Sequence, residues 1–227
     1  MLVEQVAPEL WRLALMPRDV LNVYVAGNVL IDSGSRWTRR RLMAALAGRT
    51  IRAHALTHAH FDHQGSSHAV CERFGIPLCC GAGDREAVES GDLSRILPDP
   101  HACVVRVGRR LALAGPAHAV ARVLAEGDVV GGFTVLEVPG HTPGSLAYWR
   151  ERGRVLILGD VLFHRNPLTW RRGLAEPFVR ATFDRAANRA AIRRLAALEP
   201  ALVCFGHGPP LRDSEGLGAF AATLPLN

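Results

Sequence analysis

The sequence predicts an α/β fold in which short buried strands alternate with helices. Apolar runs recur between turns that contain glycine or proline, as at Ile51 to Leu56 and Ala201 to Phe205, and such runs are typical of strands. The segment Thr182 to Leu198 instead repeats its apolar residues at helical spacing. The chain has 227 residues, 48% of them hydrophobic, so we expect one domain over 1–227 with a large core.

The N-terminal half alternates strands with helices. Its turn signals are Pro17-Arg18-Asp19, Ala26-Gly27-Asn28 and Gly75-Ile76-Pro77, because glycine, proline, asparagine and aspartate favour turns. The expected strands are Trp11 to Leu15, Leu21 to Val25, Val29 to Ile31, Ile51 to Leu56 and Pro77 to Cys80. The expected helices are Thr38 to Leu46, His63 to Phe74 and Asp84 to Ser90, the last with Asp84 as its N-cap.

The C-terminal half contains two weakly patterned segments. Residues 91–128 mix prolines, glycines and short apolar stretches, and we interpret them as an insertion with helical pieces, a candidate flap near the site. Residues 162–180 form a second irregular insertion. The remaining expected elements are strands at Val129 to Val138, Ser145 to Ile157 and Ala201 to Phe205, and a helix over Thr182 to Leu198 with Thr182 as its cap.

The run Thr57-His58-Ala59-His60-Phe61-Asp62-His63 concentrates three imidazoles and one carboxylate. Each of these groups needs a partner if it is buried. A divalent ion supplies one, since neutral histidine nitrogen and aspartate oxygen both bind first-row metals such as zinc. On an extended segment His58 and His60 point to the same side. The run therefore predicts a metal site, with ligands that can serve two neighbouring ions.

Further candidate ligands follow three strand-like segments later in the chain. His141 lies in Gly140-His141-Thr142-Pro143-Gly144, Asp160 follows a glycine, and His207 stands between two glycines. Polar residues in this position suit a site where loops converge at one edge of a sheet. The candidate metal ligands are therefore His58, His60, Asp62, His63, His141, Asp160 and His207. The histidines without such context, which we interpret as structural or surface residues, are His54, His68, His101 and His118.

This ordered set of ligands, His-x-His-x-Asp-His followed by His, Asp and His, resembles the metallo-β-lactamase superfamily over roughly residues 20 to 210. The resemblance implies an αββα sandwich of two mixed β-sheets flanked by helices, with the site along one edge. The ligands of one ion would be His58, His60 and His141, and those of the other Asp62, His63 and His207. Asp160 would bridge both ions, and Asp32 would have a structural role under the metal loop. The expected cofactor is two Zn²⁺ ions, with iron or manganese as alternatives.

The resemblance also implies a dinuclear hydrolase, in which a hydroxide between the two metal ions attacks a thioester, lactone or ester and Asp62 handles the proton. The Gly-His-Thr-Pro-Gly-Ser and Leu-Gly-Asp segments look like the glyoxalase II and lactonase branches. Only about twenty residues follow His207, so we expect no glyoxalase II C-terminal domain. The alternatives are a mononuclear iron persulfide dioxygenase, a β-lactamase-like amidase, against which Asp160 argues, and a non-catalytic binding protein.

Substrate choice is expected to depend on the two insertions. The candidate substrate contacts are Phe163, His164 and Arg165, followed by Trp170, Arg171 and Arg172. A solvated basic surface loop explains the same residues equally well.

Composition narrows the expected partners and location. The net charge of +6 comes with arginine and no lysine; it suits an anionic small-molecule substrate, whereas the few aromatic residues argue against nucleic acid. The cysteines number five, an odd count, so we expect free thiols. No apolar run has the length of a membrane span, and Met1 to Leu10 lacks signal-peptide features. We therefore expect a cytoplasmic enzyme, and the sequence allows a homodimer without specifying one.

Overall fold

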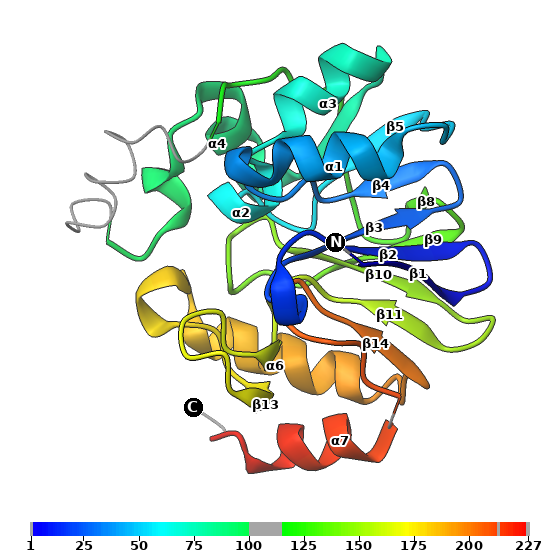
Figure 1. The fold of residues 1–227 in the computed structure, drawn as a ribbon. Helices are drawn as coiled ribbons and strands as arrows, with labels where there is room; N and C mark the ends of the chain where they lie inside the picture. Colours follow the sequence, from blue (N-terminus) through cyan, green and yellow to red (C-terminus); the bar gives the residue numbers. More distant parts are fainter. Residues whose placement is uncertain (1, 100–114, 213, 226–227) are drawn as a thin grey trace.

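The computed structural model describes residues 2–99, 115–212 and 214–225, which form two β-sheets packed face to face with helices on the outer sides (Figure 1). This is the αββα arrangement of mixed sheets that the sequence resemblance implies. The first sheet follows chain order, β1 (Leu2–Ala7), β2 (Leu10–Ala14), β3 (Asn22–Ala26), β4 (Val29–Ile31), β5 (Ala53–Ala55), β6 (Leu78–Gly81) and β7 (Arg122–Leu124). Its strands pair antiparallel from β1 to β4 and parallel from β4 to β7.

The second sheet has the order β14-β11-β10-β9-β8. Its strands are β8 (Val129–Val130), β9 (Phe133–Glu137), β10 (Leu146–Arg150), β11 (Val155–Ile157) and β14 (Leu202–Cys204). Only the β11–β14 pair is parallel. A separate hairpin of β12 (Phe163–Arg165) and β13 (Arg172–Ala175) lies within the second insertion.

Helices cover both outer faces. On the first sheet these are α1 (Arg39–Leu46), α2 (Phe61–Gln64), α3 (Ser67–Phe74) and α4 (Arg85–Ser90); on the second they are α6 (Arg185–Ala196) and α7 (Ser214–Thr223) (Figure 1). The short 3-10 helices are η1 (Pro17–Asp19), η2 (Arg36–Thr38), η3 (Ala82–Asp84), η4 (Leu93–Ile96) and η5 (Val179–Ala181). None of the helices in the described ranges is long and apolar enough to cross a bilayer.

The apolar core has one layer between the sheets and one under each set of helices. Tyr24 and Tyr148 are fully buried in the layer between the sheets. Their hydroxyl groups donate to the carbonyl oxygens of Phe205, at 2.8 Å, and Leu56, at 2.6 Å. Because a buried polar group needs a partner, these bonds let two large phenols fill the core while they hold the ends of β14 and β5, where the site lies. The cysteines in the described ranges are buried free thiols, as expected; Cys103 lies outside those ranges.

The structure corrects several expectations about element boundaries. The strand β1 was not expected, and neither was α7. The expected helix over 63–74 is two helices, α2 and α3, which meet at Gly65 and Ser66. The cap of α6 is Asp184 rather than Thr182, because the Asp184 carboxylate accepts from the Ala187 amide at 2.9 Å. Asp84 precedes α4, but its side chain does not cap that helix.

The two insertions differ in their structure. In the first, 91–128, the described residues form η4 and then β7, which extends the seven-stranded sheet. The proposed flap falls largely on residues 100–114, outside the described ranges. The second insertion, 162–180, contains the β12–β13 hairpin.

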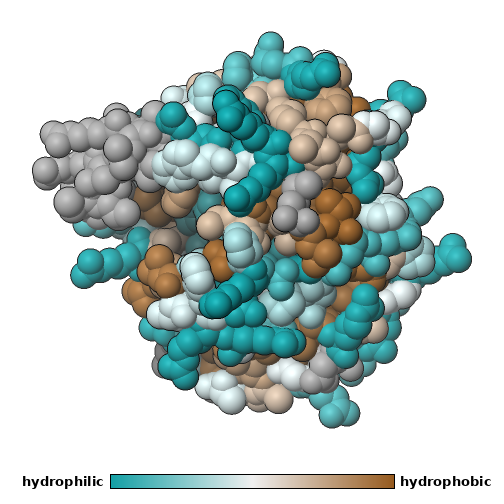
Figure 2. All heavy atoms as spheres, viewed as in Figure 1, coloured by the Kyte–Doolittle hydropathy of each residue, from teal (hydrophilic) through white to brown (hydrophobic). Residues whose placement is uncertain are grey.

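Hydrophilic side chains cover much of the visible surface, with apolar patches beside the N-terminal strands (Figure 2).

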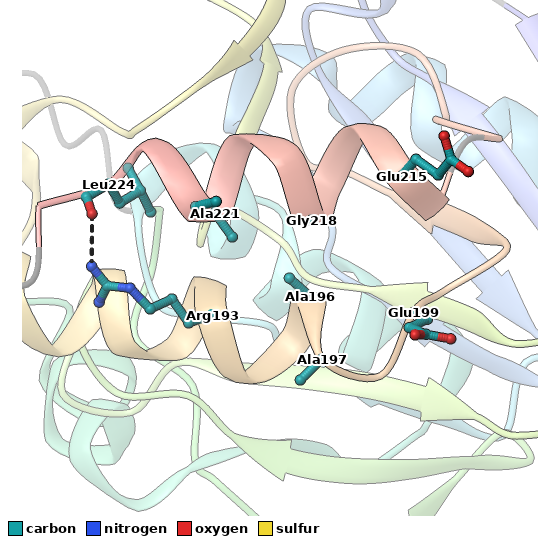
Figure 3. Close-up of a pocket in the computed structure, with 9 residues that line it drawn as sticks. Arg193, Ala196, Ala197, Glu199, Glu215, Gly218, Ala221 and Leu224 are labelled. Atoms are coloured by element: carbon teal, nitrogen blue, oxygen red, sulfur yellow. Dashed lines mark hydrogen bonds between the residues drawn. The ribbon is translucent and has the colours of Figure 1, made fainter.

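A surface groove lies between α6 and α7 (Figure 3). Small residues such as Ala197 and Gly218 line it, and Arg193 crosses it to donate to the Leu224 carbonyl oxygen at 3.1 Å. The histidines predicted to bind metal are not among its lining residues. We therefore interpret this groove as part of the helix–helix contact, separate from the candidate site.

Candidate metal centre

Loops that follow β5, β9, β11 and β14, together with α2, bring all seven predicted ligands together. They form two groups, within each of which the ligand atoms lie no more than 4.8 Å apart. The first group is His58, His60 and His141; the second is Asp62, His63, Asp160 and His207. The first group has the members that the resemblance implies for one ion, and the second has those implied for the other ion together with Asp160.

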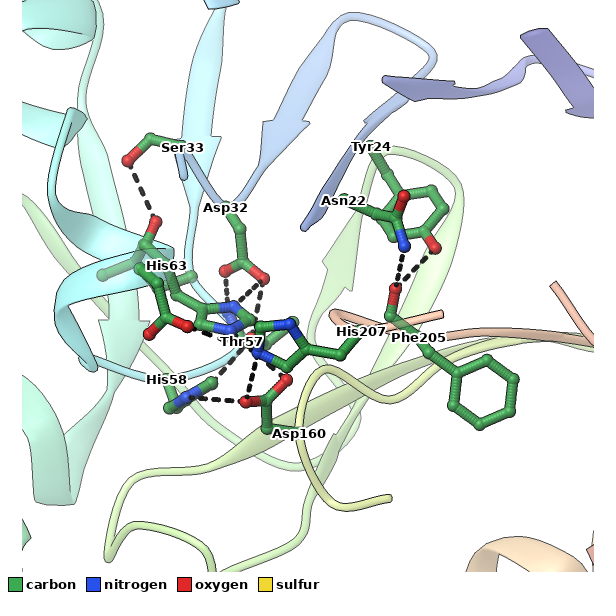
Figure 4. A network of polar contacts seen from close by, with 12 residues as sticks. Asn22, Tyr24, Asp32, Ser33, Thr57, His58, His63, Asp160, Phe205 and His207 are labelled. Atoms are coloured by element: carbon green, nitrogen blue, oxygen red, sulfur yellow. Dashed lines mark hydrogen bonds and ion pairs between the residues drawn. The ribbon is translucent and has the colours of Figure 1, made fainter. Parts of the chain in front are cut away.

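Asp160 belongs to the second group and also faces His58 of the first (Figure 4). Its Oδ2 is 4.0 Å from His58 Nε2 and 3.8 Å from His141 Nε2. The same oxygen is 3.0 Å from His207 Nε2, while Oδ1 is 3.3 Å from His63 Nε2. One carboxylate therefore faces imidazoles of both groups, which is the position a bridging ligand requires.

Several ligand atoms in this centre are buried without a hydrogen-bond partner among the described residues. They are the Nε2 atoms of His58, His60, His63 and His141, and Oδ1 of Asp160. Burying polar atoms without partners is unfavourable, and their clustering at one point suits the binding of an electrophile. A divalent cation fits, because nitrogen and carboxylate oxygen are its usual ligands.

Hydrogen bonds on the far side of two rings fix which nitrogen faces the centre. His63 Nδ1 lies 2.9 Å from Asp32 Oδ2, and His207 Nδ1 contacts the Val20 carbonyl oxygen. A carbonyl or ionised carboxylate oxygen only accepts, so Nδ1 carries the proton in both rings. Nε2 of a neutral ring is then left with its lone pair directed into the centre, as a metal ligand requires.

Two threonine hydroxyls give the same result in the other group. Thr57 Oγ1 donates to Asp32 Oδ2 at 2.8 Å, so it can accept from His58 Nδ1 at 3.0 Å. Thr182 Oγ1 donates to the Phe178 carbonyl oxygen at 2.9 Å and lies 3.4 Å from His141 Nδ1. A hydroxyl has one proton to donate, so each threonine selects the tautomer in which the imidazole Nε2 is free.

Asp32 supports this arrangement through hydrogen bonds to the start of the metal loop and to His63 (Figure 4). Besides the Thr57 hydroxyl and His63, it accepts from the Thr57 amide, 2.7 Å from Oδ1. Asp32 is buried and adopts a positive φ of 61°, a conformation that aspartate tolerates better than most residues. The structural role implied by the resemblance is therefore the orientation of His63 and the start of the metal loop.

Asp84 links the two loops that carry the ligands of the first group, a role that the sequence did not reveal. Its carboxylate accepts from the Ala59 amide at 2.7 Å, the Thr142 hydroxyl at 2.8 Å and the Gly144 amide at 2.8 Å. Burial raises the pKa of Asp84 to about 6, against the opposing effect of these donors. These bonds join the loop that bears His58 and His60 to the loop that bears His141.

Burial and charge divide the imidazoles into two classes. Burial, together with neighbouring imidazoles, lowers the pKa of His58 and His141 well below the usual value, and it lowers that of His60 to about 4. Burial alone would also lower the pKa of His207, but Asp160 and Asp62 outweigh it and raise the pKa to about 10. Positive charge beside these carboxylates is therefore favourable. A divalent cation bound there would supply that charge and allow every imidazole to stay neutral.

Gly206 provides the space in which the centre forms. A Cβ atom at this position would lie 2.3 Å from Asp160 Oδ1 and 2.6 Å from the His63 ring carbon Cε1. The backbone next to His207 thus approaches the ligands too closely for any side chain.

The three predicted substrate contacts differ in their relation to the centre. The ring centroid of Phe163 is 4.9 Å from that of His207. The His164 ring instead donates from Nδ1 to the Pro209 carbonyl oxygen at 2.7 Å, and Arg165 donates to that of Trp170 at 2.6 Å. Among these three side chains, that of Phe163 contacts a ligand ring, and the role of all three in binding substrate stays a prediction.

Comparisons with known proteins agree with this geometry. A family model described as the metallo-beta-lactamase superfamily matches residues 17–207. The probable metallo-hydrolase YflN of Bacillus subtilis is 28% identical over 179 residues, which cover 72% of this chain and 67% of YflN. A hydroxyacylglutathione hydrolase of Bdellovibrio bacteriovorus is 29% identical over 112 residues, 48% of this chain and 33% of that protein.

Two crystal structures are similar over most of the chain. TTHA1623 in a di-iron-bound form has a TM-score of 0.70 and 31% identity, covering 95% of this chain and 99% of that one. The B3 metallo-beta-lactamase BLEG-1 has a TM-score of 0.64 and 27% identity, covering 89% and 93%. The fold, the ligand groups and the family match together show that the chain belongs to the metallo-beta-lactamase superfamily.

Proposed function

We propose that the protein is a dinuclear metal-dependent hydrolase of activated acyl bonds, with thioesters, lactones and other esters as its substrate class. One observation carries the proposal: four imidazoles have their Nδ1 atoms held from behind and their Nε2 atoms directed at a buried carboxylate, Asp160. Two ligand groups on either side of one carboxylate suit two ions rather than one.

Bound there, two divalent ions would lower the pKa of a coordinated water and polarise a substrate carbonyl, which is the chemistry of hydrolysis. Asp62 is the most exposed of the seven predicted ligands, with 23% of its side chain accessible against 4% for Asp160 and His207. Its carboxylate thus lies on the open side of the centre, 3.3 Å from His207 Nε2. We assign it the role of accepting and returning the proton of the attacking water.

Residues around the ligands keep the centre ordered and dry. Asp32, Thr57 and Thr182 hold the imidazoles in one tautomer without contacting the reacting groups. Phe163 is buried and packs edge to face against His207, at an interplanar angle of 86°, so an apolar ring covers that side of the imidazole. Fixed dipoles in a water-poor cleft stabilise a developing oxyanion more strongly than solvent does.

Similarity to a hydroxyacylglutathione hydrolase supports the thioester assignment, although the match covers only a third of that relative. Similarity to BLEG-1 makes β-lactams the second candidate substrate class. Zinc is the metal we propose, and the di-iron form of TTHA1623 makes iron the alternative to test. A mononuclear iron dioxygenase would leave the group formed by Asp62, His63, Asp160 and His207 without its ion.

Metal-free protein reconstituted separately with zinc, iron and manganese should be assayed against thioesters, lactones, β-lactams and phosphodiesters. We expect two tightly bound metal equivalents and hydrolysis of a thioester or lactone, with the hydrolysis lost in D62A and folding retained. The exposed Glu137 on β9 gives the control variant E137Q, which should behave as the wild type. One iron equivalent with oxygen consumption, or inactivity on every substrate in each metal form, would overturn the proposal.

A further inference from the structure

A second group of metal-ligating side chains lies outside the candidate centre. His68, Glu72 and His118 each offer a ligand atom, and these atoms lie within 4.8 Å of one another. His68 and Glu72 are four residues apart on α3, so they occupy the same face of the helix. His118 comes from the segment that leads into β7. None of the three belongs to the two ligand groups described above.

The two imidazoles, joined by a hydrogen bond between their Nδ1 atoms, are close enough to share a cation in its place. Their Nδ1 atoms are 3.2 Å apart, and the ring planes cross at 72° with centroids 5.3 Å apart. Ligand atoms of a tetrahedral zinc ion are separated by roughly 3.3 Å, given bonds of about 2.0–2.1 Å. Burial and the neighbouring His68 lower the pKa of His118, which favours the neutral imidazole that binds metal.

The backbone that carries His118 is fixed on several sides. The His118 amide donates to the Val88 carbonyl oxygen at 3.2 Å, and the Val120 amide donates to Glu89 Oε1 at 3.2 Å. At Gly115 the chain approaches so closely that a Cβ would lie 2.4 Å from the Gly65 carbonyl oxygen. These contacts hold His118 beside α3, and a preorganised site loses less entropy on binding.

We propose that His68, Glu72 and His118 form a peripheral site for a divalent first-row ion, zinc by preference. Two imidazoles and one carboxylate with water in the fourth position are a complete zinc ligand set. His68 and His118 are half-buried and Glu72 is exposed, so the ion exchanges with solvent. The helix α3 directly follows α2, which bears Asp62 and His63. The ion would therefore link α3, and through it the helical end of the metal loop, to the segment before β7. This site does not depend on the proposed hydrolase activity.

The test counts metal ions and measures where they bind. Metal-free protein is titrated with Zn²⁺ by isothermal calorimetry and equilibrium dialysis, and Co²⁺ is used as a spectroscopic probe of tetrahedral ligation. Wild type and the control E137Q should bind one equivalent more than H118A or E72Q. Added Zn²⁺ beyond the tighter equivalents should raise the melting temperature of the wild type, and this rise should be lost in H118A.

The E72Q variant keeps the imidazole contact and removes only the charged ligand, so it separates loss of metal from loss of folding. Retention of the tighter equivalents in H118A shows that the variant still folds. Equal stoichiometry in wild type, H118A and E72Q, or a zinc-dependent melting shift that persists in both variants, would overturn the proposal.

Discussion

Replacement of Asp32 by asparagine (D32N) tests whether tautomer control prepares the centre for metal. The two carboxylate oxygens of Asp32 accept only: Oδ1 takes the Thr57 amide, and Oδ2 takes the Thr57 hydroxyl and His63 Nδ1. Asparagine has the same shape, but it presents one oxygen and one NH₂ group. The substitution therefore changes the hydrogen-bonding pattern while it leaves the packing volume almost constant.

Each orientation of the asparagine amide has a defined cost. With its NH₂ at the Oδ2 position, His63 Nδ1 must accept, and the ring proton moves to Nε2, where the metal ligand lone pair is needed. With its NH₂ at the Oδ1 position, that donor faces the buried Thr57 N–H, which then has no acceptor, at a cost of about 1–3 kcal/mol. Loss of such outer hydrogen bonds lowers metal affinity by about 10–100-fold, and we expect D32N to fall in that range.

The assay is competition with a chromogenic chelator, which gives the affinity of each metal equivalent, together with urea unfolding of the metal-free protein. E137Q, which removes an exposed carboxylate charge from β9, should match the wild type in both measurements. Wild-type metal affinity in D32N would refute the view that Asp32 sets the His63 tautomer.

Three further predictions concern stability and the shape of the centre. D184A should destabilise the protein to urea by about 1 kcal/mol, because it removes the cap of α6; an unchanged midpoint would contradict this assignment. Burial lowers the pKa of His54 to about 4 from 6.5, so folding favours the neutral imidazole. Its contribution to the free energy of unfolding is complete above pH 6.5 and is lost as the pH falls towards 4. The loss from this residue is on the order of 3 kcal/mol, and H54Q should show a correspondingly shallower pH dependence in urea unfolding than wild type. G206A should abolish metal binding at the group with Asp62 and His63, since the added methyl would collide with Asp160 Oδ1; wild-type metal stoichiometry in this variant would be inconsistent with the geometry of the centre.

The ligands and most strands could be predicted from the sequence because both depend on local patterns. His58 and its neighbours stand in one short run, and the other ligands follow apolar segments beside glycine. The strand β1 escaped prediction because its residues mix polar and apolar types, and only Val6 is buried. Its pairing with β2 is therefore set by the rest of the sheet rather than by its own sequence.

Roles that depend on long-range contacts were beyond a reading of the sequence. Asp84 precedes a helix and was assigned as its cap, yet its partners Ala59 and Gly144 lie far away in the chain. His68 and His118 are separated by fifty residues and carry no motif, so each alone resembled a surface histidine. Asp184 and Thr182 are both residue types that cap helices, and they lie two residues apart. Contacts with the loop that bears His141 decide between them, because the Thr182 hydroxyl lies beside the His141 ring.

Anomalous diffraction from crystals of the zinc-loaded protein, recorded above and below the zinc absorption edge, tests the central claim most directly. Two strong peaks should appear about 3.5–4 Å apart, one beside His58, His60 and His141, and one beside Asp62, His63 and His207, with Asp160 between them. One peak or none in contact with these seven side chains would contradict a dinuclear centre, whereas a third peak beside His68, Glu72 and His118 would belong to the proposed peripheral site.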